Sequence, residues 1–281
     1  MEAYFVAICR ATLVYLLMTG LSGCLFSRQA QGLPDRYVIE SGDLEILSDT
    51  KVSKESALFA ELSQLQTELV ELLELPPPEQ PVRIHLFQDE PRYTAYMQAT
   101  HPELPARRAF FIGTPTELAV FAYMGPSMME DIRHEYTHAV LHASLRTVPL
   151  WLDEGIAEYF EVRRYDSERR HPEHATKLAA AIALGWKPNL TRLEKVETVS
   201  QMQRTDYQEA WAWVHYLIHD CPDGRQLLAD YCQALAVSDK PPLFAQQLQQ
   251  HVPEVEIRLT SHLTGTLSSL QQVRAADHEV D

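Results

Sequence analysis

Two histidines lie four residues apart around a glutamate, in the segment His134-Glu135-Tyr136-Thr137-His138. If this segment is helical, both imidazoles project from one face and can share a metal ion, for which zinc is the usual choice. The carboxylate of Glu135 can then reach a water held by that metal. The pentapeptide alone also fits two histidines on a helix surface beside a solvated glutamate, so the interpretation depends on further ligands.

A catalytic zinc site needs a third protein ligand and one open position. His142 lies on the same expected helix, about 12 Å from His134, so these two side chains cannot meet at one ion. We expect His142 to pack or to face solvent. A second expected helix carries Glu154 and Glu158 one turn apart on one face. Fifteen residues separate His138 from Glu154, which is enough for the first helix to end and the chain to return.

The pentapeptide followed by Trp151-Leu-Asp-Glu-Gly-Ile-Ala-Glu158 resembles the gluzincin metallopeptidases, especially the aminopeptidase-N-like branch and the peptidase MA-like domains. The resemblance implies one Zn²⁺ ion held by His134, His138 and Glu154, with Glu135 as the general base. It also implies that Glu158 accepts a hydrogen bond from His134 and orients it. Glu158 stays open as an alternative third ligand, because thermolysin-like enzymes place that ligand farther from the second histidine.

A further segment, 207–217, resembles the gluzincin stretch in which a tyrosine precedes a helix. The resemblance makes Tyr207 the candidate donor to the oxyanion, with Tyr123 and Tyr216 as rivals. The segment that grips a free amino terminus in aminopeptidase-N relatives is absent at 121–126, so exopeptidase activity is not supported. We expect 115–123 to form an edge strand that can pair with an extended peptide.

The rest of the pattern predicts an α+β protein, zincin-like, with a small N-terminal mixed sheet and helices, followed by a mainly helical C-terminal part. Ser127 and Glu130 predict a capping box at the start of the metal-binding helix. We interpret 35–281 as a single domain. Strands are expected at 37–40, 44–48, 82–87, 109–112 and 117–123, and helices at 53–73, 90–98, 128–142, 151–165, 173–184, 206–219, 223–236 and 253–270.

The first 23 residues have the build of a secretory signal, with Arg10 before an apolar run that is too short to span a membrane comfortably. The segment Leu21-Ser-Gly-Cys24 resembles the bacterial lipobox, which implies a lipid on Cys24. Residues 24–34 then form a tether, and the protein is expected outside the cytoplasm in the bacterial envelope. An ordinary signal peptide or a short anchor helix is the alternative.

The composition is that of a globular protein, with 46% hydrophobic residues. Its net charge of −15 disfavours a nucleic-acid partner. A disulfide between Cys221 and Cys232 is not expected, because a helix would hold them roughly 16 Å apart. His171 and His174 can be interpreted as a second metal site, but Pro172 lies between them and the sequence shows no cysteine or carboxylate that converges on them, so a solvated loop is expected.

These observations predict a zinc-dependent metallopeptidase that acts on a peptide or protein substrate and is attached to the membrane by a lipid. Two alternatives stay open. One is a non-catalytic envelope lipoprotein that keeps the zinc-binding scaffold for binding partners. The other is a zinc hydrolase that acts on a non-peptide amide.

Overall fold

The computed structural model describes residues 32–162 and 168–278, with side chains described up to residue 270. The expected lipoprotein signal, Cys24 and most of the expected tether lie outside these ranges. No helix within the described ranges is long and apolar enough to cross a membrane.

Within the described ranges five strands form one mixed sheet in the order β1-β2-β3-β5-β4. β1 (Tyr37–Ser41) and β2 (Leu44–Ser48) make a hairpin, and β3 (Val82–Phe87) runs parallel to both β2 and β5 (Glu117–Tyr123). β4 (Ala109–Thr114) pairs antiparallel with β5 and forms the sheet edge. The expectation of an edge strand at 115–123 is therefore wrong, because β5 has neighbours on both sides.

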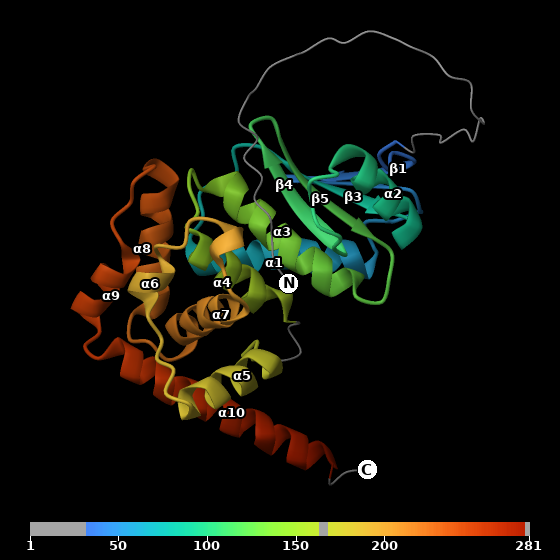
Figure 1. The fold of residues 1–281 in the computed structure, drawn as a ribbon. Coiled ribbons are helices and arrows are strands. Elements are labelled where there is room, and N and C mark those ends of the chain that lie inside the picture. The colour runs from blue at the N-terminus through green and yellow to red at the C-terminus, as the bar shows by residue number, and fades with distance from the viewer. Residues whose placement is uncertain (1–31, 163–167, 279–281) are drawn as a thin grey trace, which may run out of the picture.

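Helices cover both faces of this sheet (Figure 1). α1 (Ala57–Leu73) is capped by Ser56, which accepts from the Phe59 amide, and it buries one leucine stripe in the main core. α2 (Glu90–Thr100) packs on the opposite face in a smaller aromatic cluster around Phe87. The two faces differ because successive strand residues point to opposite sides. The stripe on α1 consists of Leu58, Leu62, Leu65, Leu69 and Leu73.

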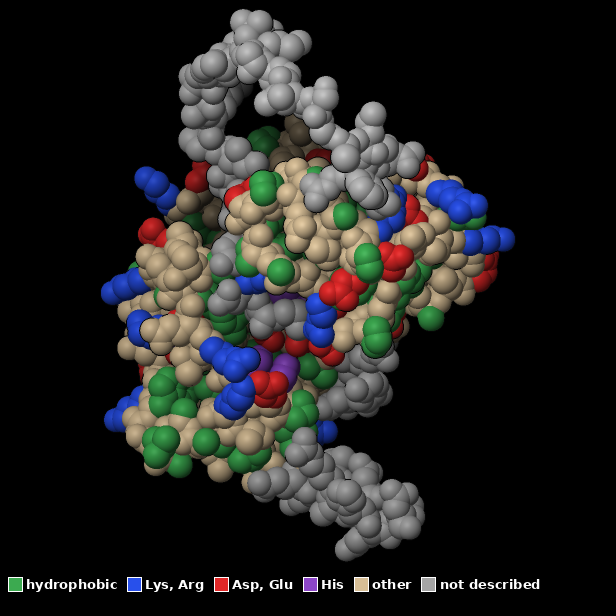
Figure 2. All heavy atoms as spheres, turned by 45° about the vertical axis from the view of Figure 1, so that its right-hand side comes forward, with side chains coloured by type: hydrophobic (Ala, Val, Ile, Leu, Met, Phe, Trp, Pro, Cys, Tyr) green, Lys and Arg blue, Asp and Glu red, His purple; other side chains and the backbone are tan. Residues whose placement is uncertain are grey.

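The chain is almost entirely helical after the sheet, which confirms the α+β class and the order of its parts. Figure 2 shows histidine and acidic side chains gathered between the sheet-bearing part above and the helical part below. The elements are α3 (Met128–Ser144), α4 (Leu150–Glu161), α5 (Pro172–Ala183), α6 (Leu190–Leu193), the short 3₁₀ turn Val199–Gln201, α7 (Arg204–His219), α8 (Gly224–Val237), α9 (Phe244–His251) and α10 (Val255–His278).

The ends of α3 and α4 differ from the expectation. Ser127 does precede α3, but its hydroxyl accepts from Arg108 at 3.1 Å, and its φ of −97° and ψ of 4° do not suit a capping box. α4 ends at Glu161 rather than near 165. Arg133 donates to the carbonyl oxygens of Phe160 and Val162, so its guanidinium satisfies the last acceptors of that helix.

Cys221 and Cys232 are free cysteines, as expected. Cys221 precedes α8, whereas Cys232 is buried within it.

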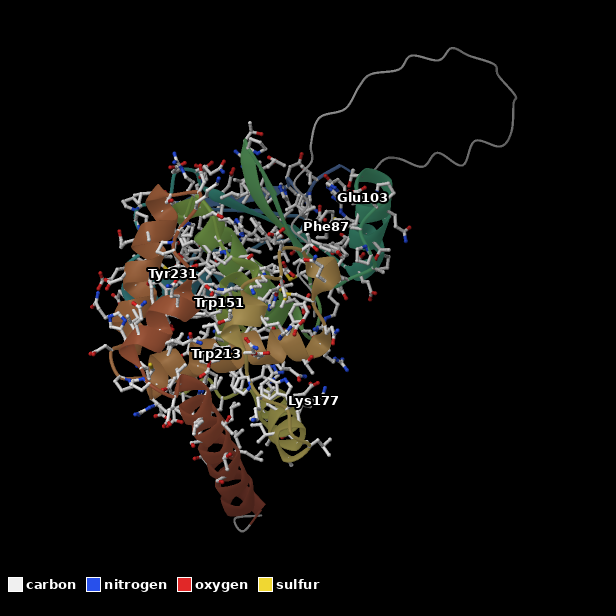
Figure 3. All side chains as sticks on the ribbon, turned by 60° about the vertical axis from the view of Figure 1, so that its left-hand side comes forward. Phe87, Glu103, Trp151, Lys177, Trp213 and Tyr231 are labelled. Carbon is white, nitrogen blue, oxygen red and sulfur yellow. The ribbon has the colours of Figure 1, made fainter. Side chains whose placement is uncertain are left out.

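α4 and α7 approach closely at Gly155. A Cβ atom on Gly155 would lie 2.6 Å from the Ala210 carbonyl oxygen and 2.8 Å from Val214 Cγ2. The bulky aromatic side chains Trp151 of α4 and Trp213 of α7 are fully buried in this part of the molecule (Figure 3). The glycine therefore sets how near the two helices lie, and α4 carries the candidate ligand Glu154.

We predict that Gly155→Ala lowers the free energy of unfolding by about 1–3 kcal/mol, because the helices must separate to admit the methyl group. Urea denaturation measures this change. Gly265→Ala is the matched control, since Gly265 is exposed in α10 with open space around it, and alanine there should stabilise the helix by up to about 1 kcal/mol. If Gly155→Ala and Gly265→Ala changed the free energy of unfolding equally, the close packing of α4 on α7 would be contradicted.

His215 joins α7 to α10 through a buried hydrogen bond. Its Nε2 donates to the Glu168 carbonyl oxygen at 2.9 Å, so its Nδ1 is left to accept from His262 Nε2 at 2.7 Å. Burial, and then the neighbouring His219 and His262, lowers the pKa of His215 well below its ordinary value of 6.5. The folded protein therefore holds His215 in the neutral form.

Because the folded pKa of His215 is depressed, its contribution to stability is present above pH 6.5 and is lost as the pH falls from there toward the folded value. We expect the free energy of unfolding to fall in that window, by up to about 1.4 kcal/mol per pH unit from this one group. Denaturant titrations between neutral and mildly acidic pH measure the slope. His215→Asn should make it shallower, whereas the exposed control His251→Asn should leave it unchanged.

Candidate metal centre

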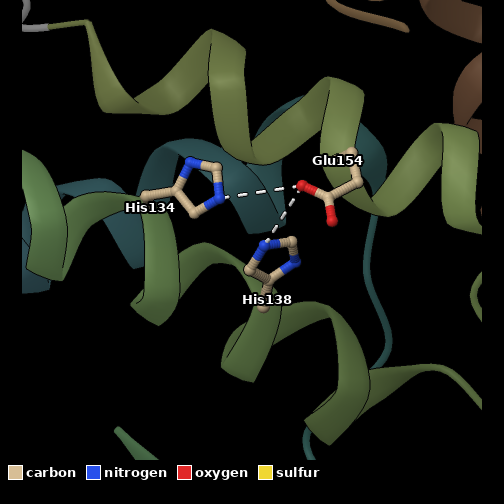
Figure 4. A group of neighbouring side chains, drawn as sticks. All are labelled: His134, His138 and Glu154. Atoms are coloured by element: carbon tan, nitrogen blue, oxygen red, sulfur yellow. Dashed lines mark ion pairs between the residues drawn. The ribbon is translucent and has the colours of Figure 1, made fainter. Parts of the chain in front are cut away.

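The structure brings His134, His138 and Glu154 together, as the sequence predicts. Glu154 Oε2 lies 3.7 Å from His134 Nε2 and 3.8 Å from His138 Nε2 (Figure 4). Two donors bonded to one tetrahedral zinc ion at about 2.0–2.2 Å lie roughly 3.4 Å apart. The three atoms are thus arranged almost as ligands of a single ion, with both histidines on α3 and Glu154 on α4.

Four polar atoms of this group have no hydrogen-bond partner within the described part of the chain: Nε2 of each histidine and both carboxylate oxygens of Glu154. All three side chains are at most 1% exposed, so bulk solvent does not reach these atoms. A buried polar atom without a partner costs about 1–3 kcal/mol, and more when charged. Burial raises the pKa of Glu154 to about 8. A divalent cation would bind the unpartnered atoms of all three residues. It would also favour the ionised form of Glu154 over the protonated form.

Each histidine is oriented by a carboxylate of α4. His138 Nδ1 donates to Asp153 Oδ1 at 2.7 Å, and His134 Nδ1 donates to Glu161 Oε2 at 2.9 Å. With the proton on Nδ1, the lone pair of each Nε2 faces the other ligands. The neighbouring His142 does not enter the group but contacts the second oxygen of Asp153 at 3.0 Å, which agrees with its expected packing role.

The orienting role expected of Glu158 is therefore wrong, because Glu161 accepts the hydrogen bond from His134. Glu158 Oε2 instead accepts from His174 Nε2, in the first turn of α5, at 2.9 Å. Glu158 also does not join the group that contains both His134 and His138, whereas Glu154 does.

His171 and His174 are not in a solvated loop. His171 caps the start of α5, and its ring is partly buried, whereas His174 is buried within the first turn. A carboxylate lies beside each ring: Glu158 Oε2 is 2.9 Å from His174 Nε2, and Glu161 Oε1 is 3.4 Å from His171 Nε2. The prediction failed because these carboxylates are 10 and 16 residues away along the chain, and only the folding of α5 against α7 and α10 brings its first turn near them.

Glu135 lies against the edge of the sheet. Its Oε2 accepts a hydrogen bond from the Phe111 amide of β4 at 2.8 Å, and the residue is buried. This contact fixes the direction of the Glu135 carboxylate. The sequence did not indicate the Phe111 contact, because it depends on how the sheet edge meets the helix.

Tyr207 lies in the first turn of α7 and is buried. It lines a cavity of about 300 Å³ that Glu158, Glu161, His171 and His174 also line. The tyrosine is thus on the side of α4 where the second pair of carboxylates gathers, and its role as an oxyanion donor stays a prediction.

Asp153 and Glu161 are functional residues that sequence reasoning missed as partners of the ligand histidines. Asp153 could have been found from its place directly before Glu154 and one turn from the start of the helix. Glu161 carries no comparable signal, since its distance along the chain from His134 implies no contact.

We predict that Asp153→Asn weakens zinc binding roughly 10–100-fold, because a neutral amide supports the His138 tautomer less well than a carboxylate. Competition with a chromophoric chelator measures the dissociation constant. Asp230→Asn on the exposed face of α8 is the matched control and should leave the constant unchanged. If Asp153→Asn and Asp230→Asn bound zinc with the same dissociation constant, Asp153 would not act through His138.

A comparison of the sequence with known protein families and with curated proteins found no match. The chain thus carries a buried His-x-x-x-His pair and a glutamate that could bind a metal ion, and the gluzincin family stays a resemblance of motifs.

Proposed function

We propose that the chain is a zinc-dependent metallopeptidase. The observation that supports this most is the convergence of two unpartnered imidazole nitrogens and an unpartnered carboxylate beside Glu135. Their donor set, two nitrogens and one carboxylate oxygen, is that of catalytic zinc sites with one position left for water or substrate.

A bound Zn²⁺ would supply positive charge that acidifies a water and polarises the substrate carbonyl. Glu135 would take the proton of the attacking water on its carboxylate and pass it to the leaving amine. The Phe111 amide holds that carboxylate in place, so less of its freedom must be lost during the reaction. Tyr207 would donate from its hydroxyl to the oxyanion.

The outer edge of β4, which pairs with no further strand of the described sheet, is where an extended peptide would bind. Phe111 directs its amide away from β5, toward Glu135, so Ala109 and Gly113 face the same edge on either side of it. A peptide that adds as a strand would find main-chain partners there and would lie along α3. This arrangement favours an unstructured protein segment over a small non-peptide amide as the substrate.

The place of action is part of the proposal. The signal-like N-terminus and Cys24 point to a lipid-anchored protein on the outer side of a bacterial cytoplasmic membrane or on an outer membrane. A substrate in the cell envelope would then meet the enzyme at a membrane surface.

A specific observation favours the non-catalytic alternative, namely the near-complete burial of all three ligands, which suits a structural ion. Zinc content measured beside proteolysis separates the two functions. Zinc-loaded protein that cleaves no unstructured protein such as casein would support the structural role.

We predict that Glu135→Gln keeps its zinc and loses about 10²–10⁴-fold in turnover, because the amide cannot accept the proton. His138→Ala should lose both zinc and turnover. Metal analysis and casein hydrolysis, with and without a chelator, measure the two properties. The exposed Glu71→Gln on α1 serves as the control and should change neither. If Glu135→Gln retained full zinc-dependent hydrolysis, Glu135 would not be the general base.

A further inference from the structure

We propose a second site for a divalent transition-metal ion, formed by Glu158 of α4 and by His171 and His174 of α5. One ligand atom from each of these residues lies within 4.8 Å of the other two. The proposal is independent of the peptidase activity, because it concerns the binding of a second ion and not its chemistry.

Two helices each present a pair of potential ligands three residues apart. Glu158 and Glu161 share a face of α4, and His171 and His174 share a face at the start of α5. The two imidazole rings stack with centroids 3.6 Å apart and an angle of 6° between their planes. Both Nε2 atoms lie beside carboxylates of α4. Because a metal ion lies in the plane of each imidazole that binds it, one ring must tilt out of the stack when the ion enters.

The burial and charge of the cluster suit a cation. Glu158 is 2% exposed and His174 8% exposed, so two of the three ligands are largely removed from water. Two imidazole nitrogens and a carboxylate oxygen form a donor set that binds Zn²⁺ and related divalent ions. The charges of Glu158 and Glu161 together would balance such an ion.

Glu161 connects the proposed site to the first one. Its Oε2 accepts from His134 Nδ1, and its Oε1 lies 3.4 Å from His171 Nε2. Because His134 uses its other nitrogen toward Glu154, the two sites use different atoms and can be filled together. An ion bound to His171 Nε2 would replace the proton that now lies between His171 and Glu161, and its positive charge would attract the same carboxylate.

The cavity of about 300 Å³ beside these residues leaves room for the ion and its water ligands. Arg204 and Gln208 complete the lining on the side of α7. Binding requires that both Nε2 atoms give up their protons. When His171 binds the ion through Nε2, its proton lies on Nδ1, which can then no longer accept from the His174 amide. The hydrogen bond that is lost is long, at 3.3 Å, and a metal–nitrogen bond replaces it.

The test is the zinc content of the full chain after equilibration with Zn²⁺ and removal of free metal, measured by elemental analysis. We expect about two equivalents in the unchanged protein and about one in His171→Asn or Glu158→Gln. Asparagine at 171 can still cap α5, and glutamine at 158 can still accept from His174, so both variants should fold. Unchanged far-ultraviolet circular dichroism checks this, and His251→Asn is the control that removes an exposed imidazole.

His138→Ala distinguishes the two sites. The second site predicts that this variant keeps about one equivalent, and that adding His171→Asn to it abolishes binding. If the unchanged protein binds one equivalent that His138→Ala removes and His171→Asn does not, the second site is refuted and the first stands. If the single equivalent is lost with His171→Asn and not with His138→Ala, the second site stands and the proposed catalytic centre is refuted.

Discussion

The structure depends on the burial of four carboxylates on one side of α4. Asp153, Glu154, Glu158 and Glu161 lie within an arc of about 140° when each residue advances the helix by 100°. Each is less than 9% exposed. Carboxylates removed from water must be paired, protonated or bound to a metal. The imidazoles of α3 and α5 partner three of them directly, whereas both carboxylate oxygens of Glu154 have no hydrogen-bond partner among the described residues.

The side of α4 opposite the carboxylates is buried as well. Trp151, Ile156 and Phe160 occupy the remaining arc and pack in the main core. The backbone of α4 meets α7 at Gly155, where a side chain would not fit. Arg133 of α3 satisfies the last carbonyl oxygens of the helix. The carboxylates are thus held by a rigid element, as a preformed metal site requires.

The sheet positions the remaining chemical group. β4 is short and forms the edge, and its Phe111 amide bonds Glu135 on the neighbouring helix. In the proposed peptidase, the edge that holds Glu135 is also the one at which an extended chain would add. That arrangement would link substrate binding to the geometry of proton transfer.

The outcome for the histidines shows where sequence reasoning succeeds. The spacing of His134 and His138 requires only that one helix form, and helical periodicity there is strong. Glu154 required one further step, the return of the next helix, and its motif indicated it. The α+β order and most element bounds followed from local patterns in the same way. The Ser127 capping box failed because Arg108, distant along the chain, contacts the hydroxyl.

The sequence by itself determined which side chains share a helix face, because that depends only on the helical repeat. It therefore placed both histidines on one side of α3 and both Glu154 and Glu158 on one side of α4. Only the tertiary structure decided which carboxylate meets which imidazole: Glu161 rather than Glu158 on His134, and Glu158 on His174. The physical reason is that several carboxylates on one face are equally available to a neighbouring ring. The choice among them depends on the crossing of α3, α4 and α5, which no local pattern encodes.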